Sequence, residues 1–327
     1  MYTPKYSVIL SNVGSCSDRY VSGGYSNPFT TAELFDRVAS IDNVEGVELV
    51  ATWHVTTENV KEIKAQLEDK NLKLVSIIPD HFGTMKWGKG AFSSKDENIR
   101  KMAVSHTKDM IDVGRELGCD TISLWPGQDG YDYSFTADYA QERTWFEDGV
   151  RECCDYKKDM NISIEYKPKE PRNRSYPSNV SSTLLMVNEI NRENCGVTID
   201  YGHAVVAYEN VAESVAILKK YGDKLFHMHV NDNYGFWDDD MITGSINTIA
   251  YLELLYYLKK TNYNGYLSMD QYPYREDGKR AVEESIKWLI KLNEIVDRMD
   301  TNEVESIIHS GDATNATAMI RKYMFGV

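Results

Sequence analysis

Short apolar runs alternate with longer amphipathic stretches along most of this chain of 327 residues. The runs have the length and the β-branched and aromatic content of buried strands, and the stretches between them repeat apolar residues at helical spacing. Eight runs follow the pattern, at 6–10, 46–51, 72–78, 121–125, 162–168, 196–203, 225–232 and 266–270. Strict alternation predicts a parallel sheet, and eight units favour closure into a single (β/α)8 TIM barrel of the α/β class.

The amphipathic stretches contain signals for the starts and ends of helices. Thr30 followed by Glu33 resembles a capping box, and Gly118 is placed to end a long helix. Further helices are expected near 57–69, 135–159, 180–192, 211–221, 246–260 and 279–296. We assign 1–298 to the barrel and 299–327 to a C-terminal helical extension, because the tail has too little apolar surface to fold alone.

The composition, with 42% hydrophobic and 26% charged residues, is typical of a soluble globular protein. No apolar run approaches the ~20 residues of a membrane helix, and the N-terminus leads directly into a strand, so we expect a cytoplasmic protein without a membrane partner. The five cysteines have no CxxC spacing and predict neither a disulfide framework nor a thiolate metal site. The net charge of −14 opposes binding to a phosphate backbone, which excludes nucleic acid as an expected partner.

Four of the runs in the second half of the chain end in carboxylates or imidazoles. The carboxylates and imidazoles near these ends are Glu165, Asp200, His203, His227, His229 and Asp270. Because a helix returns the chain after each strand, the carboxyl ends of the strands share one rim of the barrel. Carboxylates and imidazoles without thiolates predict a site for Mn²⁺, Mg²⁺, Co²⁺ or Zn²⁺, with the harder ions favoured.

These polar residues also have structural interpretations. Glu165 and Lys167 lie two apart on one strand, point to the same side, and could form a buried ion pair. Asp200 could cap a helix while His203 is a hydrogen-bonded core histidine, and the acidic run 238–240 could be a solvated loop. Their common placement at strand ends favours the functional interpretation, and two groups of ligands suggest two ions.

Several motifs of the chain are similar to those of xylose isomerase. They are WGKGAFSSKD at 87–96, Leu124-Trp125 followed by Gly127, EYKPKEPR at 165–172, FHMHVN at 226–231 with Asp238-x-Asp240, and Asp270 with Arg275. The resemblance spans roughly 46–275. It implies a TIM barrel that binds two divalent ions and interconverts aldoses and ketoses.

The resemblance also implies roles for individual residues. A first, substrate-binding ion would be held by Glu165, Asp200, His229 and Asp270, and a second, mobile ion by His203, Asp238 and Asp240. The candidate catalytic residues are Lys167, which would contact the carbonyl oxygen of the substrate, the ring-opening histidine His54, and Asp240. The candidate substrate-binding residues are Trp125, Trp87, His203, Asn231 and Arg275.

The chain departs from the xylose isomerase pattern at three positions. Asp200 and His229 stand where that family has a glutamate and an aspartate, and this pair resembles L-rhamnose isomerase. Thr57 stands where the aspartate partner of the ring-opening histidine is expected, which puts ring opening by His54 in question. The substrate sugar therefore stays open, as does the implied homo-oligomer, a dimer or a tetramer.

The expected function is that of an intramolecular oxidoreductase, a sugar isomerase that uses two divalent ions (Mn²⁺, Co²⁺ or Mg²⁺). Two cations on adjacent substrate oxygens would allow a hydride to move between C1 and C2, with proton transfer through an enediolate as the alternative mechanism. The stretch 266–277 has no glycine-rich turn for a phosphate, so the small-molecule substrate is expected to be a free sugar.

Four other functions are compatible with a barrel of this kind. A sugar 3-epimerase would use one metal and two glutamates, but Asp270 replaces the second glutamate, and Lys167 and the Asp238/Asp240 pair argue against it. A barrel subunit that cleaves carbon-linked glycosides would need a second chain. A DNA-repair endonuclease conflicts with the acidic balance, and a non-catalytic sugar-binding barrel conflicts with the complete ligand set.

Overall fold

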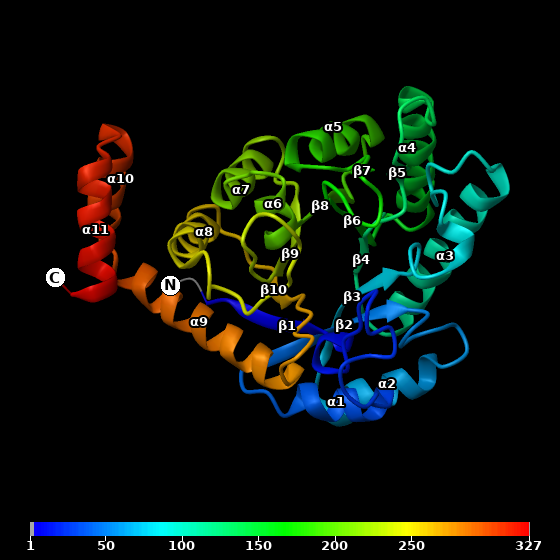
Figure 1. Cartoon of the computed structure of the whole chain (residues 1–327), viewed down its shortest axis with the longest axis horizontal. Helices are drawn as coiled ribbons and strands as arrows, with labels where there is room; N and C mark the ends of the chain where they lie inside the picture. Colours follow the sequence, from blue (N-terminus) through cyan, green and yellow to red (C-terminus); the bar gives the residue numbers. More distant parts are fainter. Residues whose placement is uncertain (1–2, 327) are drawn as a thin grey trace.

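A closed barrel of eight parallel strands forms the centre of the computed structural model, which describes residues 3–326 (Figure 1). The barrel strands are β1 (Lys5–Ile9), β2 (Val44–Ala51), β3 (Lys73–Pro79), β4 (Thr121–Leu124), β6 (Asn161–Glu165), β8 (Cys195–Asp200), β9 (Leu225–Val230) and β10 (Tyr266–Met269). Each strand pairs with its neighbours along the chain, and β10 closes the ring against β1. The predicted (β/α)8 fold is confirmed.

Helices surround the barrel and return the chain between strands (Figure 1). They are α1 (Thr31–Ala39), α2 (Val60–Lys70), α3 (Glu97–Glu116), α4 (Tyr139–Tyr156), α5 (Val180–Ile190), α7 (Val211–Lys220), α8 (Thr248–Lys260) and α9 (Gly278–Arg298). The expected capping box is present, because Thr30 accepts a hydrogen bond from the amide of Glu33. Gly118 follows α3 with a φ of 78°, a left-handed conformation that glycine adopts without steric cost.

The strand ends and several short elements differ from the sequence prediction. The run at 196–203 is a strand only to Asp200, and Tyr201 begins the helix α6 (Tyr201–Val206). The reason is local, since the Asp200 carboxylate accepts a hydrogen bond from the amide of His203 and caps this helix. The run at 162–168 likewise ends at Glu165, and β5 (Gly130–Tyr131) pairs antiparallel with β7 (Arg174–Ser175) outside the barrel.

The tail forms two helices, α10 (Thr301–Ser310) and α11 (Ala313–Phe325), which stand beside the far end of α9 (Figure 1). Glu303 joins the two helices by accepting hydrogen bonds from Lys322 at 2.9 Å and from Tyr323 at 2.8 Å. Val304 is buried in α10, and α11 has no buried residue among those described. The division of the chain at 298 and 299 stays a prediction.

The core fills the barrel and the space between the barrel and its helices. Strands buried on both faces, such as Cys195–Asp200, explain why the sequence shows continuous apolar runs rather than alternation. All five cysteines are buried and free, in agreement with the absence of a predicted disulfide framework. Over residues 3–326 no helix has the length and apolar character needed to cross a membrane.

Candidate active site

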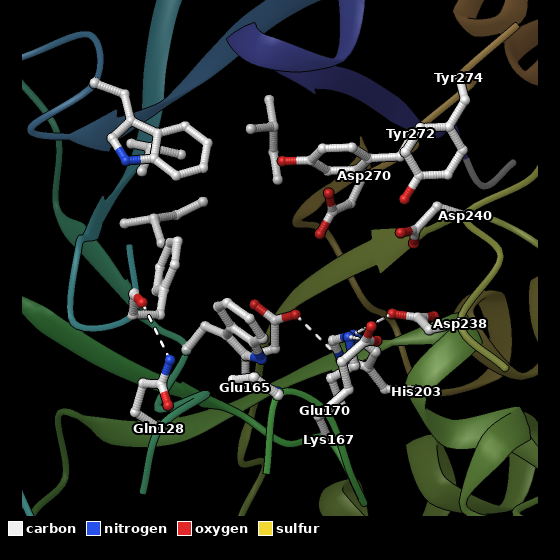
Figure 2. A pocket seen from close by; sticks show the side chains of 17 residues that line it. Gln128, Glu165, Lys167, Glu170, His203, Asp238, Asp240, Asp270, Tyr272 and Tyr274 are labelled. Atoms are coloured by element: carbon white, nitrogen blue, oxygen red, sulfur yellow. Dashed lines mark hydrogen bonds and ion pairs between the residues drawn. The ribbon is translucent and has the colours of Figure 1, made fainter. Parts of the chain in front are cut away.

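A cavity of about 360 Å³ opens at the carboxyl ends of the barrel strands. Its polar side is built by residues at or just after the ends of β6, β8, β9 and β10, and Figure 2 shows their side chains pointing toward one another. Its other side is formed largely by apolar residues of β1, β2, β3 and the loops after β3 and β4. The cavity therefore combines a cluster of ionisable groups with an apolar wall, as small-molecule sites commonly do.

The four residues predicted to hold the first ion converge at the bottom of this cavity. Glu165, Asp200, His229 and Asp270 each place one ligand atom within 4.8 Å of the others. Glu165 and Asp270 border the cavity, whereas Asp200 and His229 are completely buried beneath it. Parallel register explains part of this meeting, because Asp200 of β8 is paired directly with His229 of β9.

The Nδ1 atom of His229 is the observation that best fits a bound cation. It is buried without a hydrogen-bond partner, although it lies 3.2 Å from Glu165 Oε2 and 3.4 Å from Asp270 Oδ2. Burial alone would lower the pKa of His229, but Glu165 and Glu48 outweigh burial and raise it well above its usual value. A positive charge is favoured at this point, and the imidazole and carboxylate donors suit a divalent ion.

A second group of ligands adjoins the first. It consists of Asp200, His203 and Asp238, all buried. His203 Nδ1 lies 2.9 Å from the carbonyl oxygen of Tyr166, which can only accept, so Nδ1 donates and Nε2 faces Asp238 Oδ2 at 3.0 Å. Burial lowers the pKa of His203, but Asp200 and Asp238 outweigh it and raise the pKa to about 9.

Asp240, the third residue predicted for the second ion, borders the same cavity without joining this group. Its Oδ1 accepts a hydrogen bond from Asn231 Nδ2 at 3.1 Å. Burial and the neighbouring Asp238 raise the pKa of Asp240 well above its usual value. Asp200 takes the place predicted for Asp240 in this group, and the Asp200 carboxylate also caps α6.

Lys167 lies at the polar edge of the cavity in a nearly buried ion-pair network. Its Nζ is 2.8 Å from Asp238 Oδ2 and 2.9 Å from Glu170 Oε2, and it lies 5.4 Å from the ring centroid of Trp125. Burial would lower the pKa of Lys167, but Asp238 and Glu170 outweigh it and raise the pKa. The ammonium therefore stays charged beside the second ligand group.

The apolar wall is built by aromatic rings in edge contact. The Phe82 and Trp125 rings are 4.5 Å apart, and the Trp53 and Phe82 rings are 5.7 Å apart. Ile9, Val50 and Ile78 form a small buried cluster against Phe82 and also line the cavity. Of the predicted wall residues, Trp125 is in place.

Four residues predicted for catalysis or substrate binding do not line this cavity. His54 is buried with its Nδ1 accepting from the amide of Val50 at 3.1 Å, and Trp53 faces the cavity instead. Burial lowers the pKa of His54 to about 4. Trp87 is buried against His81 at a ring separation of 5.2 Å.

Arg275 and Asn231 also lie outside the cavity lining. Arg275 is exposed, with its guanidinium 5.1 Å from the ring centroid of Tyr25. Asn231 is buried below the cavity and donates to Asp200 at 2.9 Å and to the carbonyl of Asp270 at 3.0 Å. Asn231 thus orients the ligands instead of bordering the cavity.

Several site residues were missed by the sequence reasoning. Gln128, Glu170, Tyr272 and Tyr274 line the cavity, and Glu48 lies buried next to His229. Glu170 was within reach, because it belongs to the EYKPKEPR motif three residues after Lys167. Glu48 gave a weaker signal, as the one carboxylate in the otherwise apolar run at 46–51.

This fold and this cluster define a TIM barrel with a candidate divalent-metal centre at the carboxyl ends of its strands. A model of the xylose isomerase-like TIM barrel family matches residues 35–292, and the chain belongs to that family.

Sequence relatives of this chain include xylose isomerases. Xylose isomerase of Thermus thermophilus is 28% identical over 229 residues, which cover 68% of this chain and 59% of the relative. Xylose isomerase of Fervidobacterium gondwanense is 29% identical over 64% of this chain and 51% of its own length. The chain thus spans between one half and three fifths of these relatives.

Two solved structures share the fold. A D-tagatose 3-epimerase-like protein superimposes with a TM-score of 0.67 at 24% identity, over 89% of this chain and 99% of its own. D-psicose 3-epimerase of Clostridium cellulolyticum H10 gives a TM-score of 0.69 at 15% identity, over 88% of this chain and 99% of its own.

Proposed function

We propose that this protein is a divalent-metal-dependent aldose–ketose isomerase that acts on a free sugar. The observation that supports this most is the convergence of Glu165, Asp200, His229 and Asp270 on one buried point of the cavity. The curated relatives named xylose isomerase support the same class of reaction. An aromatic wall opposite the ligands suits the apolar face of a sugar ring or chain.

The polar residues divide the work between binding and charge stabilisation. Glu165, Asp200, His229 and Asp270 would hold one ion, and His203 and Asp238 with Asp200 would hold a second. Bound divalent ions would supply Lewis-acid chemistry, which would polarise the sugar carbonyl, acidify the neighbouring hydroxyl and so permit a hydride shift between C1 and C2.

Lys167 would place its ammonium beside the substrate oxygen on which negative charge develops. Asp238 and Glu170 hold the Lys167 Nζ at 2.8 and 2.9 Å, so this charge is oriented before substrate binds. Trp125 and Phe82 would exclude water from the reacting carbons, since their rings form the wall facing the ligands.

A second candidate function is a sugar epimerase that transfers a proton. The supporting observation is that Glu165 and Asp270 both border the cavity and both reach the same nitrogen of His229, at 3.2 and 3.4 Å. Two carboxylates in such positions could remove and return a proton at one carbon.

The test is to strip the protein with chelator, restore Mn²⁺, Co²⁺ or Mg²⁺ separately, and follow a panel of free pentoses and hexoses by proton NMR in D₂O. Metal-dependent aldose–ketose conversion with little deuterium at the transferred position is the expected result. Inverted stereocentres with deuterium incorporation would favour the epimerase instead. No conversion of any sugar by metal-loaded protein would refute the isomerase proposal for that panel.

A further inference from the structure

A buried polar network lies beneath the candidate metal centre without reaching the cavity. It joins Glu48 of β2, Ser76 of β3, and His227 and His229 of β9. Glu48, Ser76 and His229 are fully buried, and the β2–β3 register places Glu48 directly beside Ser76. The interior of such a barrel is normally filled by branched apolar side chains. Burying a carboxylate there costs free energy unless the group is hydrogen-bonded or paired.

Both oxygens of Glu48 are already used as hydrogen-bond acceptors. Oε1 lies 2.8 Å from His227 Nε2, and Oε2 accepts from Ser76 Oγ and lies 3.4 Å from His229 Nε2. The oxygen that faces His229, Oε2, already accepts a hydrogen bond from Ser76, so His229 Nε2 faces an acceptor.

This acceptor oxygen of Glu48 determines which nitrogen of His229 carries a proton. The nitrogen that faces Glu48, Nε2, must be the donor, and a neutral imidazole has a single N–H. The lone pair is then on Nδ1, which lies 3.2 Å from Glu165 and 3.4 Å from Asp270 in the first ligand group. The opposite tautomer would direct an N–H at the ion and leave a lone pair facing a carboxylate.

We propose that Glu48 is a positioning residue that selects the Nε2–H tautomer of His229, so that Nδ1 becomes the metal ligand, with Ser76 and His227 fixing the Glu48 carboxylate. The proposal rests on the metal centre of the proposed function. Carboxylates that orient metal-ligating histidines typically change metal affinity about 10–100-fold when removed. Glu48 does not border the cavity, so it influences the substrate only through His229.

The experiment is calorimetric titration of the metal-free full-length protein with Mn²⁺, comparing wild type with Glu48→Gln. The glutamine keeps the shape of the side chain but offers an amide N–H to His229, and we expect Mn²⁺ affinity at the first site to fall about 10–100-fold. The matched control is Ser163→Ala, because the Ser163 hydroxyl is buried in the barrel 2.6 Å from Thr198 and makes no hydrogen bond to a histidine. Its affinity should equal that of the wild type.

A second readout separates positioning from simple stabilisation. In Mg²⁺-loaded protein with ¹⁵N-labelled histidine, long-range proton–nitrogen NMR should show His229 as Nε2–H in the wild type and a shift toward Nδ1–H in Glu48→Gln. A purely structural role would change the unfolding midpoint without changing this tautomer.

The outcomes are distinguishable. A folded Glu48→Gln protein with wild-type Mn²⁺ affinity and unchanged tautomer would overturn this inference alone. If that variant does not fold, Ser76→Ala tests the inference instead, and we expect it to bind Mn²⁺ about three- to tenfold more weakly than the wild type. A Mn²⁺ affinity of Ser76→Ala equal to that of Ser163→Ala would overturn the inference. Wild-type protein that binds no Mn²⁺ would overturn the proposed metal centre together with this inference.

Discussion

Asp238 is the carboxylate on which the second candidate ion depends most directly. Its Oδ2 lies 2.8 Å from Lys167 Nζ and 3.0 Å from His203 Nε2, and its side chain is only 5% exposed. The change to asparagine keeps the size of the side chain and removes the charge. We expect Asp238→Asn to bind one equivalent of Mn²⁺ tightly where the wild type binds two, because the first ligand group does not include Asp238.

The same substitution should destabilise the metal-free protein. Burial raises the pKa of Asp238, but Lys167 and His203 outweigh it and lower the pKa below its usual range. A lowered pKa means that ionisation of Asp238 stabilises the folded state above a pH of about 4 and that this stability is lost as the pH falls. Breaking one partner of a buried pair costs about 3–5 kcal/mol. We expect about 3 kcal/mol, since Lys167 keeps Glu170 as a partner.

The assays are calorimetric titration with Mn²⁺ and urea unfolding in chelator, both at pH 7. The matched control is Asp239→Asn, which makes the same change at the next residue, outside both ligand groups and outside the cavity lining. Two unchanged Mn²⁺ equivalents in Asp238→Asn, or a stability equal to that of Asp239→Asn, would refute the reasoning.

Three further predictions address titration, the apolar wall and the tail. Because the pKa of His203 is raised to about 9, a proton competes with the second ion below that pH. Mn²⁺ affinity at this site should therefore rise by up to about tenfold per pH unit from pH 6 and level off near pH 9. Calorimetry at a series of pH values measures this affinity, and a flat profile would contradict the prediction. Trp125→Ala removes the ring that contacts Phe82 and Lys167, so the KM for the sugar should rise. Mn²⁺ affinity should stay within about twofold of the wild type, since Trp125 offers no metal-ligating atom. Steady-state kinetics and calorimetry test these two results, and loss of a metal site would contradict the prediction. Deletion of 299–327 should leave a folded, metal-binding barrel, because α11 has no buried residue. Circular dichroism would show whether folding depends on the tail, and light scattering whether the predicted homo-oligomer does. An unfolded product would contradict the assignment of 1–298 as a complete barrel.

The alternation of strands and helices was predictable from the sequence, because each element buries apolar side chains that recur at the period of its secondary structure. The eight barrel strands and their helices were predicted within a few residues, and the capping box at Thr30 and Glu33 was identified correctly. The convergence of the candidate ligands was also predictable, since parallel strands direct their carboxyl ends to one rim. Glu165, Asp200, His229 and Asp270 do meet there.

The loop conformations and the long-range contacts could not be predicted from the sequence and became known only from the tertiary structure. Whether His54 or Trp53 faces the cavity depends on the backbone path after β2. The periodicity of apolar residues in the sequence does not predict that path. Asp200, not Asp240, completes the second group because the α6 cap turns its carboxylate toward His203.

The chain by itself determined the fold class and the chemistry available at the rim, because burial patterns and ligand types are local properties of the sequence. The tertiary structure alone decided how those ligands divide between two groups and which side chains support them. Glu48 and His229 are 181 residues apart in the chain, yet lie 3.4 Å apart across the barrel. Such a contact arises only when strands distant in the sequence close into one ring, so a single sequence contains no direct signal for it.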